Sequence, residues 1–380
     1  KNELRFLKTI FFFKKKVKIK VIFVNDFVFS KFINTFIQLF NQILLPLMVI
    51  FLIVVRLNGL CYKCNLKAFK FTSFFSLSSG KMCTKTLKDF GYGFNTEGQL
   101  RKLDIKSGLP GSEPFEFIVS KEHSVNQQNY ESLGEAITAY IYELLETRCS
   151  LQKLTVSDGL SDISSFIYTS KDALNKEKLL ILIHGSGVVR AGQWARSLII
   201  NDCLKTGTQF EYIMKAIALD YGVIVTNTND NYREINNKKL PIPGSKSPEE
   251  HMDTVWNLYV KHSKAKNIFI VAHSYGGVVT IDFVSRQFAN INKRLTAIAF
   301  TDSVHSILTV KSPKIASYLR EITRNWVTSQ LSLDAPVTTS ATEITKLSAG
   351  HTKHEMTSST CINSVFNYFE EKYVLKKVEI

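Results

Sequence analysis

The chemistry that this sequence could support starts from one serine, in the stretch Val-Ala-His-Ser-Tyr-Gly-Gly of residues 271–277. The apolar run of residues 268–272 predicts a buried strand, and residues 278–284 have the spacing of a helix. A serine on a sharp turn between a strand and a helix is strained, and its hydroxyl is exposed at the end of a sheet. The usual pattern is Gly-x-Ser-x-Gly, and Ala272 here replaces the first glycine. We therefore predict that Ser274 is a nucleophile; the alternative is an ordinary serine on a glycine turn.

A serine hydroxyl is a weak nucleophile at neutral pH, so it needs a neighbouring base to take its proton. His354 is our candidate base, because it lies in a loop before the last predicted helix. Sites built on such a turn place serine, acid and histidine in that order along the chain. His351 is a rival in the same loop. Either residue could instead be a solvent-exposed histidine without a catalytic role.

The third candidate is an aspartate that would orient the imidazole and stabilise its protonated form. Asp302 follows the predicted strand of residues 295–300, and Asp334 also lies between Ser274 and His354. We favour Asp302 over Asp334. Both could be ordinary turn or helix-cap aspartates, which is a common use of this residue.

An oxyanion hole is predicted at His-Gly-Ser-Gly, residues 184–187, which ends the apolar run of residues 179–184. A His-Gly loop at the end of a buried strand supplies a backbone amide to the oxyanion in lipases and esterases. We expect such donors from Gly185 and Ser186, and another from the amide of Tyr275. Each would stabilise the developing charge by a few kcal/mol. The alternative is a tight glycine turn between a strand and a helix.

Candidate substrate contacts follow in the same loop, where Arg190 and Trp194 stand close to Gln193 and Arg196. An arginine beside a pocket could hold an anionic group of a substrate. It could equally form an ion pair with a surface acid. We keep Arg190 and Trp194 as the predicted substrate-binding residues.

The elements that must position these residues alternate between strands and helices. The predicted strands span residues 115–121, 151–156, 166–169, 179–184, 223–227, 268–272, 295–300 and 325–328. The predicted helices span residues 130–149, 210–220, 247–263, 278–284, 314–324 and 358–373, with a hairpin over residues 90–103 and a polar surface insertion over residues 228–246. This alternation predicts an α/β fold, with a mostly parallel sheet and helices on both faces. Sites in such sheets form beyond the carboxyl ends of the strands.

The charge of the chain is concentrated in its first 81 residues. This segment holds fourteen Lys or Arg and two acidic residues, so it carries +12 of the total +15 and leaves +3 for residues 82–380. The larger part therefore gives no electrostatic footprint for nucleic acid, and we expect no direct binding of nucleic acid.

Residues 1–81 form a basic, Phe-rich, apolar extension that we separate from a domain over residues 82–380. Residues 36–55 carry no charge, and their length suits one membrane span, although Pro46 and three amides weaken it. Two interpretations are open. The segment is a signal or anchor, or it is translated non-coding sequence ahead of a true start at Met82. The missing initiator Met and the abrupt change of composition favour the second.

The six cysteines are scattered, and only Cys61 and Cys64 have the spacing of a metal or redox pair. No second pair or nearby histidine completes a site. We therefore expect reduced structural thiols, no bound metal and no cofactor.

Several of these stretches together resemble one known family. They are residues 183–196, 221–225, 271–277, 301–305 and 348–350, with His354 and Glu355. The chain is similar over about residues 90–369 to the Argonaute-binding domain family, and within it to the metazoan cotranscriptional regulator group.

This resemblance implies an α/β-hydrolase-like fold and a hydrolase activity of undefined substrate. It also implies a role in the nucleus, and in the cytoplasm, through binding of Argonaute and of chromatin-remodelling and splicing factors, with effects on alternative splicing. Fungal members act in Argonaute chaperone complexes in heterochromatin silencing. By the same resemblance Ser274 is the nucleophile, and Asp302 and His354 lie in matching motifs.

The sequence departs from the family in two places. Relatives carry a long charged insertion where this chain has only residues 231–246, and the chain ends without the acidic endoplasmic-reticulum retention signal of some relatives. A place in that compartment, or contact with a membrane, would depend on residues 36–55. Two functions follow as hypotheses: a regulator that binds other proteins, and an active serine hydrolase of esters or thioesters that uses Ser274, Asp302 and His354.

Overall fold

The computed structural model describes residues 85–159 and 161–378. The basic extension, its uncharged segment and the Cys61–Cys64 pair therefore lie outside the described residues. Among the described helices, none combines the length and the apolar character needed to cross a membrane. Cys149, Cys203 and Cys361 are free thiols.

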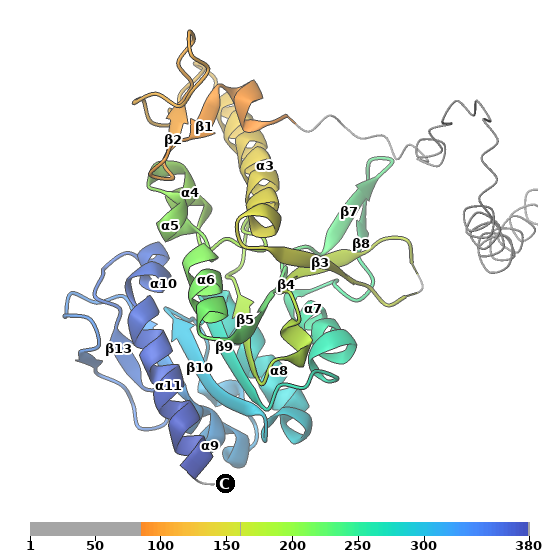
Figure 1. The fold of residues 1–380 in the computed structure, drawn as a ribbon, viewed down its shortest axis with the longest axis vertical. Coiled ribbons are helices and arrows are strands. Elements are labelled where there is room, and N and C mark those ends of the chain that lie inside the picture. The colour runs from red at the N-terminus through yellow and green to blue at the C-terminus, as the bar shows by residue number, and fades with distance from the viewer. Residues whose placement is uncertain (1–84, 160, 379–380) are drawn as a thin grey trace, which may run out of the picture. The chain divides into compact units, whose positions relative to one another are not determined.

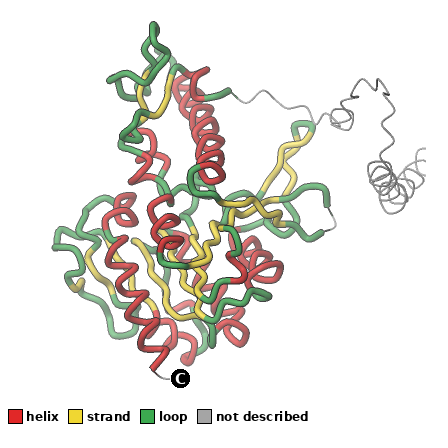
Figure 2. The backbone as a smooth tube through the Cα atoms, viewed as in Figure 1, coloured by secondary structure: helices red, strands yellow, loops and turns green. Residues whose placement is uncertain are grey.

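A nine-stranded sheet runs through the molecule in the order β12-β13-β11-β10-β9-β5-β6-β4-β3 (Figure 1; Figure 2). Its strands are β3 (Leu151–Val156), β4 (Ser165–Ser170), β5 (Lys178–Ile183), β6 (Tyr221–Val225), β9 (Asn267–His273), β10 (Leu295–Thr301), β11 (Thr323–Val327), β12 (Pro336–Val337) and β13 (Lys346–Ser348). The six strands from β13 to β6 are parallel, whereas β4 and β12 run antiparallel to their neighbours. The predicted mostly parallel α/β sheet is confirmed.

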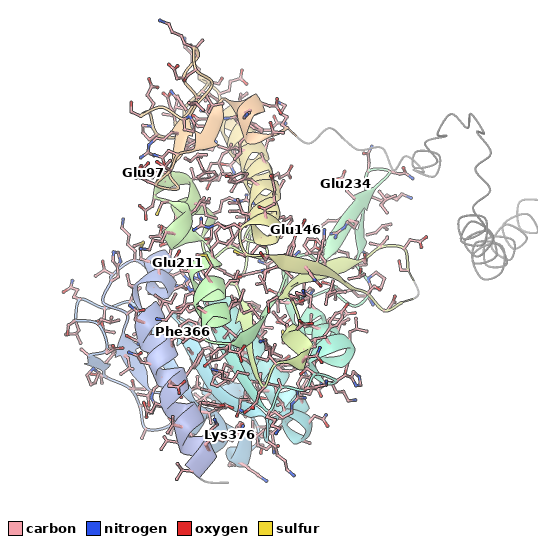
Figure 3. All side chains as sticks on the ribbon, viewed as in Figure 1. Glu97, Glu146, Glu211, Glu234, Phe366 and Lys376 are labelled. Carbon is pink, nitrogen blue, oxygen red and sulfur yellow. The ribbon has the colours of Figure 1, made fainter. Side chains whose placement is uncertain are left out.

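The central strands are apolar on both faces, which is why they can carry helices on both sides. In β5, Leu180 and Leu182 belong to one core cluster, whereas Leu179 and Ile181 belong to the other. The first cluster is covered by α6 (Phe210–Ala218) and α11 (Ile362–Val378), on which Glu211 and Phe366 are labelled in Figure 3. The second is covered by α7 (Pro248–Val255), α8 (Tyr275–Ile291) and α9 (Pro313–Ile322).

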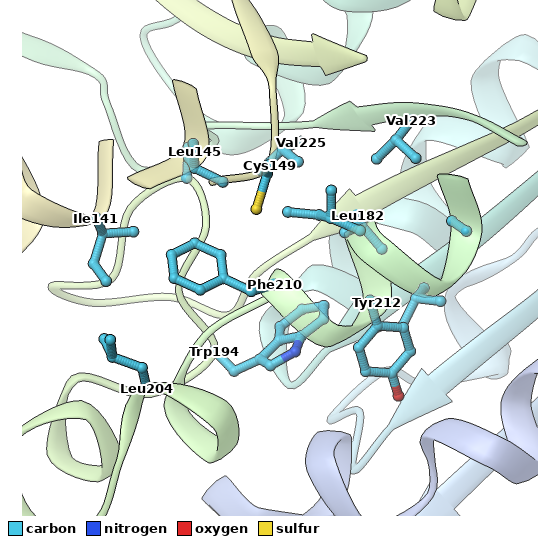
Figure 4. Packing of buried hydrophobic residues seen from close by; sticks show 14 of the residues in the cluster. Ile141, Leu145, Cys149, Leu182, Trp194, Leu204, Phe210, Tyr212, Val223 and Val225 are labelled. Atoms are coloured by element: carbon cyan, nitrogen blue, oxygen red, sulfur yellow. The ribbon is translucent and has the colours of Figure 1, made fainter. Parts of the chain in front are cut away.

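The first cluster also anchors a long helix, α3 (His123–Thr147), which carries the hairpin β1 (Tyr92–Phe94) and β2 (Leu100–Lys102) at one end. Ile141 and Leu145 of α3 lie near Trp194, Phe210 and the strand residue Leu182 (Figure 4). Two short helices, α4 (Arg196–Asn201) and α5 (Leu204–Gly207), follow the loop that contains Trp194. This packing fixes that loop against the sheet.

The strand expected over residues 115–121 is wrong, because this stretch pairs with no other strand. Its backbone donors are satisfied by side chains instead. The amides of Val119 and Ser120 donate to Asn126 Oδ1 at 3.0 and 2.8 Å, and the amide of Glu116 donates to the Tyr92 hydroxyl at 3.3 Å. A segment whose amides are satisfied in this way does not need a sheet partner.

The polar insertion contains a hairpin that the sequence analysis did not predict, β7 (Tyr232–Ile235) and β8 (Lys238–Pro241). Asn236 and Asn237 turn it with φ values of 51° and 58°, the left-handed conformation that a tight hairpin turn requires. The predicted helix of residues 247–263 begins as expected, since Ser247 Oγ accepts from the amide of Glu250, but its second half, Trp256–Val260, is a π-helical turn.

Candidate functional site

Ser274 occupies the turn between β9 and α8, with φ 53° and ψ −119°. A residue other than glycine is strained at such a positive φ, and this strain persists only where the surroundings hold it. Here the Ser274 amide donates to Thr301 O at 3.1 Å, and its carbonyl accepts from the amide of Gly277 at 3.1 Å. The side chain is partly exposed beyond the carboxyl end of β9.

Two glycines allow this turn to press against its neighbours. A β-carbon at Gly276 would lie 2.8 Å from the carbonyl oxygens of Ile183 and His184, and one at Gly277 would lie 1.8 Å from Ser303 Oγ. Neither position can hold a larger residue without moving the backbone of β5 or the loop after β10. The turn is therefore wedged between the two segments that carry the other candidate residues.

His354 and Asp302 are joined by a hydrogen bond of 2.7 Å from His354 Nδ1 to Asp302 Oδ2. Because a carboxylate only accepts, the proton lies on Nδ1 and leaves Nε2 free to act as a base. This hydrogen bond, opposed by partial burial, raises the pKa of His354 above its ordinary value. The ring is partly exposed at the start of a short 3₁₀ turn, His354–Met356.

Backbone hydrogen bonds to β11 and to the residue after it fix the loop that carries Asp302. Asp302 has φ 50°, its amide donates to Trp326 O at 2.7 Å, and its Oδ1 accepts from the amide of Thr328 at 3.2 Å. Burial alone would raise the pKa of Asp302, but the hydrogen bonds from His354 and from Thr328 outweigh it, so the pKa is lowered. The carboxylate stays ionised and can stabilise a protonated imidazole.

The two rivals make other contacts. Asp334 accepts from Trp326 Nε1 at 2.7 Å through Oδ1, and from the Ser364 hydroxyl at 2.6 Å through Oδ2. His351 Nδ1 accepts from the amide of Lys353 at 3.0 Å within its own loop. The structure therefore brings Asp302, and not Asp334, to His354.

Ser274 Oγ forms no hydrogen bond with His354 in the described part of the chain. Both residues contact the end of β10: the Ser274 amide donates to Thr301 O at 3.1 Å, and His354 bonds Asp302, the next residue. The His354 ring also lies 4.6 Å from the ring of His273, between centroids, at 38°. Catalytic hydrogen bonds are often long without substrate and shorten only in the complex.

His273 is a residue of the site that the sequence analysis did not single out. Its Nδ1 donates to Thr301 O at 2.8 Å, and Trp194 meets its ring edge-on at 6.2 Å. Burial, together with the neighbouring imidazole of His354, lowers the pKa of His273 to about 4, so the ring is neutral. Its buried ring packs against that of His354. The only signal in the sequence is its place directly before Ser274.

The predicted oxyanion loop lies against the serine. A β-carbon at Gly185 would lie 3.1 Å from Ser274 Cβ. Within the described residues, the amides of Gly185 and Ser186 donate to no protein group. The amide of Tyr275, at the first position of α8, has no acceptor within its helix. These donors are free to bind a negatively charged oxygen.

Asn229, which the sequence analysis also missed, supports the same loop from the end of β6. Its amide group donates to Gly185 O at 2.9 Å and to Val189 O at 3.1 Å. Polar residues directly after a parallel strand are a usual source of site residues, so its position after the predicted strand was a readable signal.

The two predicted substrate contacts differ in exposure. Arg190 is partly buried, and its guanidinium donates to Val189 O at 3.0 Å and to Gly187 O at 3.3 Å within its own loop. Trp194 is only 2% exposed and packs edge-on against Tyr212 at 5.5 Å. Trp194 therefore lies under the site, where it supports His273, and presents almost no surface to solvent.

No group of three or more metal-ligating side chains occurs among residues 85–159 and 161–378. Two hollows of the domain lie away from Ser274. One of about 300 Å³ lies between the β1–β2 hairpin, α3 and α6, and one of about 420 Å³ lies at the amino ends of β9 and β10. The residues gathered near the serine offer a candidate nucleophile, base and acid, together with backbone donors.

Two solved structures are weakly similar to this chain. The histone deacetylase Clr3 aligns with a TM-score of 0.45 at 15% identity, covering 70% of this chain and 47% of its own. An α/β hydrolase from Vibrio vulnificus aligns with a TM-score of 0.36 at 11% identity, covering 68% and 98%. Scores this low add nothing to the strand order described above.

Comparison of sequences is more informative. The cotranscriptional regulator ARB2A of Homo sapiens is 39% identical over 339 residues, which cover 75% of this chain and 80% of that protein. The ARB2A homolog of Dictyostelium discoideum is 36% identical over 325 residues, covering 75% and 79%. The model of the Arb2 domain matches residues 83–333, a span that includes Ser274 and Asp302. On this extent of similarity, the chain belongs to the Arb2 domain family.

Proposed function

We propose that this protein is a cotranscriptional regulator whose fold retains a working serine hydrolase site. The regulatory role is supported by the similarity to ARB2A proteins over three quarters of the chain. In keeping with the family resemblance, its partners are an Argonaute protein and chromatin-remodelling and splicing factors, and its main location is the nucleus, with a share in the cytoplasm. Binding is through protein surfaces and not directly to nucleic acid.

The regulatory role is tested in cells. Depleting the protein should change exon inclusion in sequenced RNA, and a tagged full chain should co-purify with an Argonaute protein from nuclear extract. Unchanged splicing together with no Argonaute in the purified material would contradict this part of the proposal.

The hydrolase activity is supported best by one observation, the 2.7 Å hydrogen bond between His354 and Asp302 beside a strained Ser274. A scaffold has no need of both an oriented imidazole and a serine held at positive φ. Strain of this kind is concentrated at functional sites. The substrate class is an ester or a thioester, whose carbonyl carbon is open to attack by a hydroxyl.

The proposed reaction has two halves. Ser274 Oγ attacks the carbonyl carbon, its proton passes to His354 Nε2, and the oxygen of the tetrahedral intermediate is held by the amides of Gly185, Ser186 and Tyr275. The intermediate collapses as the C–O or C–S bond breaks, and the imidazolium gives its proton to the leaving alcohol or thiol. A water molecule then repeats these steps on the acyl-serine and releases the acid.

A fluorophosphonate probe tests the serine directly, because it phosphonylates only an activated hydroxyl. The full chain should be labelled, Ser274→Ala should lose the label, and Ser197→Ala, on the exposed side of α4, should keep it. Equal labelling of the Ser274→Ala variant, or none of the native chain, would leave the regulatory role alone. Since that role is measured by binding and splicing, the two parts can fail separately.

We also propose the division of the chain at residue 81. Fusing residues 1–81 to a fluorescent reporter tests whether the extension is a signal or an anchor. A reporter that stays dispersed would leave the domain from residue 82 as the functional unit, whereas membrane insertion would support the anchor.

A further inference from the structure

A second feature with the properties of a binding site lies at the opposite end of the sheet from Ser274. It is the hollow of about 420 Å³ whose lining includes Lys266, Asn267, Lys293, Arg294, Lys376 and Lys377. β9 begins in this hollow at Asn267 and ends at His273, so the hollow is roughly 20 Å from the serine at ~3.3 Å per residue. Lys376, on the last turn of α11, is labelled near the C-terminal end of the chain in Figure 3. We call this feature the basic hollow.

The charges around the basic hollow are almost all of one sign. Its lining has five cations and one acid, Glu177, and in the described part of the chain none of the five forms a salt bridge. Glu177 accepts from the Tyr373 hydroxyl at 3.3 Å and keeps its negative charge, so the lining, with its five cations, carries a net charge of +4. Because residues 82–380 carry only +3 in total, this excess is local.

Lys376 is the least solvated of these cations. Its ammonium donates to the Thr296 hydroxyl at 3.1 Å and to Lys266 O at 3.4 Å, and burial lowers its pKa. A partly buried ammonium with only neutral partners is costly, and an anion brought into the hollow would relieve that cost. The exposed amines of Lys266 and Lys293 would face the same anion.

We propose that the basic hollow binds a short acidic segment, rich in Asp or Glu, of a partner protein. Lys376 is hydrogen-bonded, and the Lys377 ammonium lies 4.3 Å from the centre of the Tyr373 ring, so the exposed donors in the hollow are Lys266 and Lys293. Lysine ammonium groups are mobile point charges that suit several carboxylates spaced along a chain. Arg294, the one residue with the planar fork that favours phosphate, is occupied. Its guanidinium donates to Ala265 O at 2.7 Å, to Ser263 O at 3.1 Å and to three further oxygens of the same segment.

Nucleic acid fits the basic hollow less well. No lining residue is aromatic, so bases would have nothing to stack on. The near-neutral charge of residues 82–380 also leaves no extended basic stripe for a phosphate backbone. This inference does not rest on the proposed hydrolase, because the two sites share no residue.

The test measures fluorescence anisotropy of a fluorescein-labelled hexaglutamate peptide mixed with the full chain. Binding should be detectable below about 100 µM protein, and should weaken as salt rises from 50 to 300 mM, because exposed charges are screened. Lys266→Glu combined with Lys293→Glu should weaken binding by about 10-fold or more. Lys376→Met, which keeps the length of the side chain and removes its charge, should weaken it by a smaller factor.

The matched control is Lys106→Glu with Lys121→Glu, which changes the net charge equally at two exposed lysines elsewhere in the domain. This variant should bind within about 2-fold of the native chain, since its charges are beyond the screening distance. A thermal melt of each variant checks folding.

Three results would overturn the proposal. They are no binding of hexaglutamate at 100 µM, an equal loss in the Lys106/Lys121 variant, and tighter binding of an oligothymidylate or of inorganic phosphate with the same dependence on Lys266 and Lys293. The last result would identify a phosphate site in place of a peptide site.

Discussion

Asp302 Oδ2 lies 2.7 Å from His354 Nδ1, although 52 positions separate the two residues. Each is delivered by a different part of the sheet. Asp302 follows β10 and is held by backbone groups of Trp326 in β11 and of Thr328 just after it, whereas His354 follows β13 and precedes α11. The hydrogen bond between them therefore depends on the correct placement of the carboxyl ends of β10, β11 and β13. A change to either residue should be visible in both activity and its pH dependence.

Replacing Asp302 by Asn should lower kcat/KM for an activated ester by about 10³- to 10⁴-fold, because the amide no longer stabilises the imidazolium. The control is Asp334→Asn, which weakens the bonds to Trp326 and Ser364. It should cost about 1–3 kcal/mol of stability and leave kcat within a few-fold. Ester kinetics and urea unfolding of both variants separate the two roles. A large loss of kcat in Asp334→Asn alone would show that the acid is misassigned.

The apparent pKa of the acidic limb of the pH–rate profile should be higher than the ordinary histidine pKa of about 6.5. The base must be neutral, and the hydrogen bond to Asp302 raises the pKa of His354. Activity should therefore fall as pH drops through that raised value. In Asp302→Asn the main cause of the shift is gone, so the limb should move to lower pH. Profiles of kcat/KM from pH 5 to 9 measure this, and a limb that does not move would exclude His354 as the titrating base.

Ser274→Gly should make the protein more stable while it removes activity. Glycine adopts φ 53° without strain, so we expect the free energy of unfolding to rise by about 1 kcal/mol. Ser285 offers a comparison inside α8, where the same change should lower stability by about 1 kcal/mol. Urea denaturation measures both. A loss of stability in Ser274→Gly would mean that the turn stores no strain.

The elements of the fold that could be predicted are those with a strong local pattern. The unbroken apolar runs of β5, β9 and β10 required burial on both faces, and Ser247 before Pro248 marked the start of α7. The strand predicted over residues 115–121 does not form, because side chains of Asn126 and Tyr92 accept hydrogen bonds from its amides. Those contacts depend on how α3 packs, which no local pattern contains.

Some residues of the candidate site could likewise be predicted from a local pattern, and others could not. Ser274 could be located from the turn alone, since glycines must follow wherever helix and strand approach this closely. Asp302 and Asp334 could not be separated with certainty, because each follows a strand and only the packing of β11 against β10 directs one of them to His354. The edge-on contact of His273 with Trp194 joins β9 to a distant loop, and a contact between such distant rings has no signature in sequence.

Stability should fall between pH 6.5 and pH 5, because three buried histidines are kept neutral. Burial lowers the pKa of His184 and of His273 to about 4 and that of His251 to about 3. Below pH 6.5 the unfolded chain takes up protons that the folded chain cannot, so the free energy of unfolding decreases by up to about 4 kcal/mol per pH unit for the three. The raised pKa of His354 acts in the opposite direction: its contribution is present below pH 6.5 and is lost as pH rises through the folded value.

A variant at His251 isolates one of these three contributions. The His251 ring accepts from the amide of Asn227 at 3.2 Å through Nε2 and hydrogen-bonds the Ser245 hydroxyl at 2.9 Å through Nδ1. The partly buried His305, whose pKa is also lowered to about 4 by burial and by the charge of Lys346, adds a fourth contribution to the slope. Glutamine can accept the first bond without titrating, so His251→Gln should flatten the pH slope by about a quarter. The exposed Asn290→Gln, which removes no titratable group, should leave it unchanged. Urea unfolding at pH 7, 6 and 5 gives the slopes, and an equal slope in native chain and His251→Gln would mean that this ring is protonated in the folded state.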